Sequence, residues 1–246
     1  MTDDELLRRA RRLLSESESP AAFTGAGMSK ECGIRTFRGE EGFWREYRAE
    51  DLATPGALRK NPRLVWEWYR ERLVRYGEVE PHEGYHALVE AERRLGSLPV
   101  ITQNVDGLHH RAGSSEVVEL HGTLRTVSCM EEPGRTYPLE PELLEELPPR
   151  CECGAVLRPD VVLFGEPLPV EAISRAIDLA DSCDLMLVVG TSMVVFPAAS
   201  IPYRTLSRGG HVLEINPEAT PLSGEPGVLH VSGGAAETLP LLLEGW

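Results

Sequence analysis

The chain has no hydrophobic run long enough to cross a bilayer, and its acidic N-terminal end lacks the apolar core of a signal peptide. Lysine is rare in the chain, which has only Lys30 and Lys60, and the net charge is −14 over 246 residues. Nucleic-acid binding depends on neutralising phosphates with basic side chains. We therefore expect neither a membrane nor a nucleic-acid partner.

Cysteine is scarce and odd in number. Five cysteines in a chain of this length favour a reducing compartment with free thiols or a metal over a disulfide scaffold. We therefore expect a cytoplasmic protein. The length allows one large α/β domain, or a domain with a small insertion, to bury a substantial core. Nothing in the sequence requires more than a monomer.

Short apolar runs alternate with helical patterns along much of the chain. Helical periodicity over residues 84–95 and 170–181 separates several of these runs. Strands are predicted at residues 21–24, 98–102, 117–120, 185–189 and 212–215, with 228–231 as a further candidate. Such alternation predicts an α/β fold in which helices cover both faces of a parallel sheet.

Two stretches interrupt this alternation. Residues 40–80 carry three of the four tryptophans and helical periodicity, whereas residues 123–160 hold three cysteines and many prolines and glutamates. Both are expected to be insertions outside the sheet. We predict a Rossmann-like domain made of residues 1–39, 81–122 and 161–246, and a smaller domain with a helical insert and a cysteine module, made of 40–80 and 123–160.

A glycine-rich turn, FTGAGMSKECGIRTFRG, spans residues 23–39 after the first predicted strand. Gly25 and Gly27 fit the first two glycines of a dinucleotide-binding fingerprint, but Lys30 stands at the third position. A turn of this kind lets backbone N–H groups approach a phosphate at a helix N-terminus. An ordinary strand-to-helix turn explains the two glycines equally well.

Polar side chains follow two other predicted strands. Asn104 and Asp106 come after the strand that ends near Thr102, and His121 follows the strand that ends at Leu120. Open α/β sheets bind ligands beyond the carboxyl ends of their strands. An imidazole is suited to general base catalysis because its ordinary pKa lies near neutral pH. The alternative is that these side chains only satisfy backbone groups in turns.

Four motifs in fixed order resemble the sirtuins, the NAD-dependent protein-lysine deacylases. They are GAGxSxxxGIxxFRG from Gly25, TQNVDGLH at 102–109, ELHG at 119–122 and GTS at 190–192. The resemblance spans nearly the whole chain. It implies that NAD and an acylated lysine of a protein substrate bind in a cleft between the Rossmann-like domain and the smaller domain.

The resemblance also implies a mechanism and a set of residues. The acyl oxygen of the substrate attacks the anomeric carbon of NAD, nicotinamide leaves, and His121 acts as general base on a ribose hydroxyl. Water then gives free lysine and O-acyl-ADP-ribose, with Asn104 and Asp106 as further catalytic residues. The implied cofactor-binding residues are Gly25, Ala26, Gly27, Ser29, Thr36, Phe37, Arg38, Trp44, Gln103, Asn104, Val105, Asp106, Gly190, Thr191, Ser192, Asn216 and Ala235.

Two other functions would use a similar site. A mono-ADP-ribosyltransferase would consume the same cofactor, and a non-catalytic module would only sense NAD. The presence of Asn104, Asp106 and His121 together disfavours the non-catalytic module.

A possible acyl-recognition pair lies in the predicted helix that begins at Asn61 and Pro62, a good N-cap followed by a good first residue. Tyr69 and Arg72 are three residues apart, so they share a helix face. An arginine and a tyrosine hydroxyl make a suitable clamp for a carboxylate. An ordinary amphipathic helix is the alternative interpretation.

The pair also resembles the class III sirtuins, which remove succinyl, malonyl and glutaryl groups. That resemblance includes Ala53, whose small side chain leaves room for a long acyl group. A further segment resembles the family's peptide-binding strand, where main-chain hydrogen bonds hold an extended substrate. Its residues are Val162, Phe164, Gly165 and Glu166.

The cysteine module departs from the family pattern of two C-x-x-C pairs that hold zinc. Cys129 has no cysteine three residues later, and Cys151 and Cys153 are separated by one residue instead of two. Tetrahedral zinc takes four ligands, so a carboxylate such as Glu132 would have to complete the site. The other possibility is that the module folds without a metal.

Overall fold

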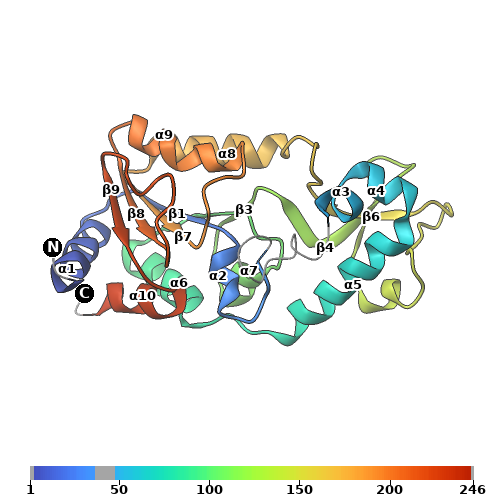
Figure 1. Cartoon of the computed structure of the whole chain (residues 1–246), viewed down its shortest axis with the longest axis horizontal. Helices are drawn as coiled ribbons and strands as arrows, with labels where there is room; N and C mark the ends of the chain where they lie inside the picture. The colour runs from blue at the N-terminus through green and yellow to red at the C-terminus, as the bar shows by residue number, and fades with distance from the viewer. Residues whose placement is uncertain (1–2, 37–47, 245–246) are drawn as a thin grey trace.

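The computed structural model describes residues 3–36 and 48–244. A six-stranded, wholly parallel sheet has the strand order β3-β2-β1-β7-β8-β9 (Figure 1). Its strands are β1 (Pro20–Thr24), β2 (Val100–Thr102), β3 (Val117–Glu119), β7 (Leu185–Val189), β8 (His211–Ile215) and β9 (Val228–Val231). The strand order reverses between β1 and β7, where an open α/β sheet places its ligand site.

Helices cover both faces of this sheet, as Figure 1 shows. One face packs on α1 (Asp3–Ser15), α6 (Glu83–Leu95) and α10 (Ala235–Leu243), and the other on α8 (Val170–Ser182) and α9 (Ile201–Ser207). Neighbouring residues of β1 divide between the two layers, since Ala22 joins the first core and Phe23 the second. This alternation explains why β1 and β7 are buried at every position.

A smaller module lies beside the large sheet (Figure 1). It contains a three-stranded antiparallel sheet with the order β5-β4-β6. Its elements are α3 (Ala49–Leu52), α4 (Pro55–Lys60), α5 (Pro62–Glu78), β4 (Gly122–Cys129), β5 (Thr136–Pro138), the 3-10 helix η2 (Pro141–Leu144) and β6 (Leu157–Val161). The remaining short elements are α2 (Ala26–Lys30), α7 (Leu108–Ala112) and the 3-10 helix η3 (Ala198–Ser200).

Helix α5 begins where the sequence predicts. The Asn61 side chain accepts a hydrogen bond from the Leu64 backbone N–H at 3.2 Å, and Pro62 is the first helical residue. One face of α5 is buried, through Val65, Trp66, Trp68, Tyr69, Arg72 and Tyr76. The indole N–H of Trp66 donates to the Leu157 carbonyl at 2.8 Å, which joins α5 to β6.

The predicted fold class is confirmed: a parallel sheet covered by helices, with a smaller module that carries three of the five cysteines. All six predicted strands form, and 185–189 and 228–231 match to the residue. The sequence analysis did not predict the antiparallel strands of the module. The proposed domain boundaries remain a prediction. Within residues 3–36 and 48–244, no helix has the length and apolarity that a membrane span requires.

Candidate active site

The glycines of the two loops that follow β1 and β7 pack against one another. The Gly27 N–H donates to the Gly190 carbonyl at 2.7 Å. A Cβ on Gly27 would lie 2.7 Å from the Gly190 oxygen, and a Cβ on Gly25 would lie 2.7 Å from the Cβ of Thr191. Gly190 itself has a φ of +61°. The two glycine motifs, far apart in sequence, therefore form one closely packed pair of turns, the glycine cradle, in which a side chain at Gly25 or Gly27 would collide with the neighbouring loop.

Asn104 and Asp106 converge on Ser29 of α2. The Asn104 amide donates to the Gly25 carbonyl at 2.9 Å and to the Ser29 hydroxyl at 3.0 Å. The Ser29 hydroxyl donates to Asp106 at 2.7 Å and lies 2.9 Å from the Tyr85 hydroxyl. The structure thus brings together the glycine turn and the loop after β2, which the sequence predicts to share one site.

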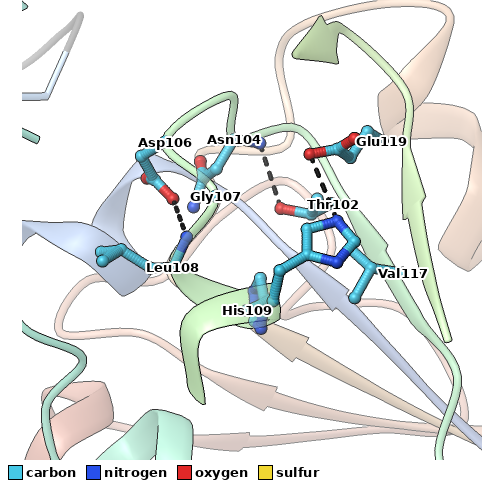
Figure 2. Close-up of a pocket in the computed structure, with 9 residues that line it drawn as sticks. Thr102, Asn104, Asp106, Gly107, Leu108, His109, Val117 and Glu119 are labelled. Carbon is cyan, nitrogen blue, oxygen red and sulfur yellow. Dashed lines mark hydrogen bonds and ion pairs between the residues drawn. The ribbon is translucent and has the colours of Figure 1, made fainter. Parts of the chain in front are cut away.

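Asp106 also holds the start of helix α7, two residues before Leu108. Its carboxylate accepts the Leu108 N–H at 3.0 Å (Figure 2). Burial raises the pKa of Asp106, while the hydrogen bonds from Ser29 and Leu108 and the charge of Arg72 act in the opposite direction. A carboxyl group with a raised pKa at the end of a strand is a common feature of functional sites.

A buried hydrogen-bonded chain fixes the start of the loop after β2. Thr24 donates its hydroxyl hydrogen to Thr102 Oγ1 at 2.8 Å, so the Thr24 oxygen accepts from His109 Nε2 at 2.9 Å. Thr102 Oγ1 also accepts the Asn104 N–H at 3.1 Å, as drawn in Figure 2. The buried Nδ1 of His109 has no hydrogen-bond partner among the described residues. The ring is therefore neutral.

This neutral histidine predicts acid sensitivity. Burial lowers the pKa of His109 to about 3, against about 6.5 in an unfolded chain. The contribution of neutral His109 to the free energy of unfolding is fully present above the pKa of about 6.5 that the histidine has in the unfolded chain. It is lost as the pH falls from about 6.5 towards 3, by up to about 1.4 kcal/mol per pH unit. We expect the free energy of unfolding, measured with urea between pH 7 and 4.5, to fall less steeply with decreasing pH for His109→Asn than for the wild type. Equal slopes would contradict this assignment.

His121 lies between β3 and β4, two residues beyond the end of β3, and its ring orientation is set by the backbone. His121 Nδ1 lies 3.0 Å from the Gln103 carbonyl oxygen, which can only accept, so Nδ1 carries the hydrogen and Nε2 carries the lone pair. The His121 carbonyl in turn accepts the Val162 N–H at 2.8 Å. Burial lowers the pKa of His121, and the bond to Gln103 partly offsets this effect. The half-buried imidazole is thus a neutral base at neutral pH.

A pocket, called the cavity below, opens beside this loop. Its described lining residues are Ala26, Ser29, Ile34, Arg35, Arg72, Tyr76, Asn104, Val105 and Asp106. Residues of the glycine turn, of the loop after β2 and of helix α5 therefore face one space. Sequence reasoning placed Arg72 in the acyl site and Asn104 and Asp106 near NAD, and it did not assign a role to Ile34, Arg35 or Tyr76.

The arginine of the predicted clamp has a different hydroxyl neighbour from the one that the sequence suggests. Arg72 is only 4 % exposed, and its Nε donates to the Tyr76 hydroxyl at 3.0 Å, with Nη2 as a second donor to the same oxygen. Its guanidinium carbon lies 4.5 Å from the ring centre of Trp68. Tyr69 packs edge-on against Trp68, with 4.7 Å between ring centres, and is not among the described residues that line the cavity.

The predicted peptide-binding segment lies next to Ala53. The Phe164 N–H donates to the Ala53 carbonyl at 2.8 Å, and the Phe164 side chain is exposed. Glu166 does not face an open site: it binds both terminal nitrogens of Arg158, at 2.7 and 2.8 Å, and accepts the Leu163 N–H at 2.9 Å. Gly165 between them has a φ of +93°. Glu166 therefore holds the turn, which leaves Phe164 at its exposed tip.

The remaining predicted cofactor residues also lie beyond carboxyl ends of strands. The Gln103 amide donates to the Thr191 hydroxyl at 2.9 Å, which links the loops after β2 and β7. Ser192 follows in the same loop, Asn216 comes directly after β8, and the buried Ala235 begins α10. Thr36 is half-buried at the edge of the described chain. Phe37, Arg38 and Trp44 lie outside the described residues.

Three thiols of the small module lie close together. The sulfur atoms of Cys129, Cys151 and Cys153 are all within 4.8 Å of one another, and those of Cys129 and Cys153 are 3.6 Å apart. A hydrogen bond from Tyr137, at 3.2 Å, lowers the pKa of Cys151 to about 7, towards the thiolate that metals bind. The trio fits three of the four positions of tetrahedral zinc, where the ion would tie β4 to the turn before β6.

Glu132, the suggested fourth ligand, points elsewhere in the structure. Its carboxylate binds Arg135 at 2.6 Å and is not part of the described thiol group.

We expect zinc analysis of protein grown with added zinc to find about one ion per chain, held by thiolates, and Cys151→Ser to lose it. Glu132→Gln is the matched control and should keep the ion if the carboxylate is not a ligand. Less than about a tenth of an ion in the wild type would remove zinc from the account.

The glycine cradle, the Asn104 and Asp106 loop and His121 match a known family. Its sequence profile, described as the Sir2 family, matches residues 25–197. The chain belongs to the Sir2 family, the sirtuins. Two similar relatives are an NAD-dependent protein deacylase of Thermococcus kodakarensis, 48 % identical over 97 % of this chain and 95 % of that protein, and one of Pyrococcus furiosus, 47 % identical over 97 % of each.

Solved Sir2 structures have the same overall fold as this sirtuin. A Sir2 homologue in complex with NAD is 43 % identical and superposes with a TM-score of 0.86, covering 96 % of this chain and 92 % of that one. A Sir2 protein bound to a myristoylated histone peptide is 35 % identical with a TM-score of 0.79, covering 97 % of this chain and 95 % of that one.

Proposed function

We propose that this sirtuin is an NAD-dependent protein-lysine deacylase that prefers acyl groups ending in a carboxylate, such as succinyl and malonyl, and removes acetyl groups more slowly. The observation that carries this proposal is the position of Arg72. Arg72 lines the same cavity as Asn104 and Asp106. A cation at the inner end of an acyl site favours a negatively charged acyl tail.

NAD as co-substrate suits the residues present. The close packing of Gly25 and Gly27 on Gly190 fixes the turn at the start of α2, where backbone N–H groups can meet a bound pyrophosphate. When bound, NAD supplies an electrophilic ribose carbon with nicotinamide as leaving group. We assign Asn104 and Asp106 to the nicotinamide side of the site, because both hydrogen-bond to Ser29 at the cradle.

The chain's own residues then have distinct roles. His121 Nε2 takes a proton from a ribose hydroxyl, because Nδ1 already donates to the Gln103 carbonyl. We assign the segment from Val162 to Phe164 to the peptide; because the N–H groups of both residues already donate to His121 and Ala53, the segment would bind an extended peptide through its carbonyl groups, as in strand addition. The relatives named as NAD-dependent protein deacylases and the relative bound to a myristoylated histone peptide support an acyl-lysine substrate. Monomer state and cytoplasmic location remain predictions.

A panel of peptides tests the acyl preference. One sequence carries acetyl, succinyl, malonyl, glutaryl or myristoyl on the same lysine, and nicotinamide release is followed with each. The proposal predicts the highest kcat/KM for one of the three acidic acyl groups, by about tenfold or more over acetyl, because one charged hydrogen bond contributes about 1.5–3 kcal/mol. A higher value for acetyl or myristoyl than for every acidic group would reject it.

A further inference from the structure

We propose that Glu214 is a positioning residue for the adenosine half of NAD and acts through the loop that follows β8, residues 216–227. This inference rests on NAD as the co-substrate in the proposed function, but not on the acyl preference. Glu214 is fully buried in a strand whose other buried residues are apolar: Val212, Leu213 and Ile215. A carboxylate is costly to bury at such a position, so it indicates a polar task.

The two carboxylate oxygens of Glu214 each accept a hydrogen bond from a hydroxyl of the loop. The Thr220 hydroxyl donates to Oε1, and the Ser223 hydroxyl donates to Oε2. Because these hydrogens are donated to Glu214, the hydroxyl oxygens are free to accept backbone N–H groups. Thr220 Oγ1 accepts the Leu222 N–H at 3.1 Å, and Ser223 Oγ accepts the Thr220 N–H at 2.8 Å. The buried carboxylate therefore fixes the course of the backbone from residue 220 to residue 223.

The same loop begins with Asn216, which the sirtuin resemblance implies in cofactor binding. The Asn216 amide donates to the Glu218 carbonyl at 2.7 Å, so the loop backbone orients this side chain. Glu218 lies only two residues before Thr220, which Glu214 holds. A change at Glu214 is therefore transmitted to Asn216 through a short segment of loop.

The loop after β8 is also tied to the loop after β9. The Asn216 carbonyl accepts from His230 Nε2 at 3.0 Å, and the Ser232 hydroxyl donates to the Pro217 carbonyl at 3.0 Å. The second loop leads directly into α10, which begins at Ala235, another implied cofactor residue. The two loops form one hydrogen-bonded surface beyond the carboxyl ends of β8 and β9, where an open α/β sheet binds its ligand.

The strand order separates this surface from the reacting groups. The loops of Asn104 and His121 follow β2 and β3, which lie beyond β1, whereas β8 and β9 lie beyond β7. The glycine cradle between β1 and β7 stands in the middle. A dinucleotide that crosses the cradle with its nicotinamide at Asn104 has its adenosine at β8 and β9. Disturbing Glu214 should therefore weaken NAD binding and leave the chemical step at His121 unchanged.

The test compares Glu214→Gln with Glu225→Gln, a control that removes the same charge from an exposed residue between β8 and β9. The KM for NAD is measured with a saturating acetyl-lysine peptide, the KM for that peptide with saturating NAD, and the Kd of ADP-ribose by titration calorimetry. The glutamine amide leaves one of the two hydroxyl hydrogens without an acceptor. We expect Glu214→Gln to raise the KM for NAD and the Kd of ADP-ribose about tenfold, with kcat and the peptide KM within about twofold. Glu225→Gln should change none of these values by more than about twofold.

Ser223→Ala is a milder second variant, which removes one hydroxyl and leaves the carboxylate in place. It should raise the KM for NAD about threefold or more, and it decides the question if Glu214→Gln does not fold. An unchanged KM for NAD in the folded variants would overturn the inference. An equal rise in both KM values, or a loss confined to kcat at saturating NAD, would also overturn it, because either result is that of a general structural role.

The outcome is separable from that of the acyl panel, because these assays use only the acetyl peptide. Rejection of the preference for acidic acyl groups would leave the role of Glu214 standing. A wild-type enzyme that releases no nicotinamide from NAD with any acyl peptide would reject the proposed function and this inference together.

Discussion

Replacing His121 with alanine is expected to lower kcat by about 10³-fold or more, since a positioned general base typically contributes 10²–10⁴-fold. His121 is the imidazole at the end of β3, with Nδ1 committed to the Gln103 carbonyl and Nε2 able to accept a proton. Binding of NAD and of the acyl peptide should change little, because the glycine cradle and the Phe164 segment do not involve this ring. Titration calorimetry and steady-state nicotinamide release measure the two quantities separately.

His86→Ala is the matched control, because His86 is an exposed histidine on α6. It should retain wild-type kcat. Turnover within about tenfold of wild type in His121→Ala would contradict the role of His121 as base, because the expected loss is far larger.

The same residue sets the acid limb of the pH profile. Burial lowers the pKa of His121, and a base works only in its neutral form. Activity should therefore persist at neutral pH and fall as the pH drops through this lowered pKa, which lies below the ordinary value of about 6.5.

Replacing Arg72 with methionine has the second large expected effect. Methionine keeps a similar volume but removes the guanidinium that faces the cavity with Tyr76 and Asp106. Desuccinylation should lose about 100-fold in kcat/KM, since the interaction is charged and can be bidentate, while deacetylation should change by less than about threefold. Rates on paired succinyl and acetyl peptides provide the comparison.

Arg72→Lys is the graded control. It keeps the positive charge but loses the planar fork, so the succinyl-to-acetyl ratio should fall between those of the wild type and the methionine variant. Equal losses on both peptides in Arg72→Met would show that Arg72 supports the fold of α5 and does not read the acyl group.

The parallel sheet could be predicted from the sequence because its signals are local. A strand buried on both faces is a short apolar run, and β7 and β9 match to the residue for that reason. The prediction for β2 began at Leu98, but the strand starts at Val100, directly after Pro99, which has no N–H to pair. The antiparallel strands β4 and β6 were not predicted, because their pairing joins Cys129 to Leu157 across a long cysteine- and proline-rich segment.

The site shows the same division between local and non-local information. The sequence places Gly25, Asn104 and His121 after strands, and parallel topology then brings those ends to one edge of the sheet. It does not reveal that Gly27 packs on Gly190, because that contact joins loops about 160 residues apart.

Helical spacing likewise places Tyr69 and Tyr76 on one face without deciding which one meets Arg72. The packing of Trp68 against the guanidinium and against the Tyr69 ring makes that choice in the folded chain. The resemblance to class III sirtuins implies Tyr69 in the acyl site, and that role stays a prediction; the hydroxyl that Arg72 contacts in this structure is that of Tyr76. A signal for Tyr76 was present in the sequence as a second aromatic hydroxyl one turn beyond Arg72.

Mass analysis of the nucleotide formed from NAD and a succinyl-lysine peptide tests the central claim most directly. The account predicts unmodified lysine on the peptide and a succinyl ester of ADP-ribose in equal amounts, with nicotinamide as the third product. ADP-ribose attached to the protein or peptide, with the succinyl group still on the lysine, would contradict it.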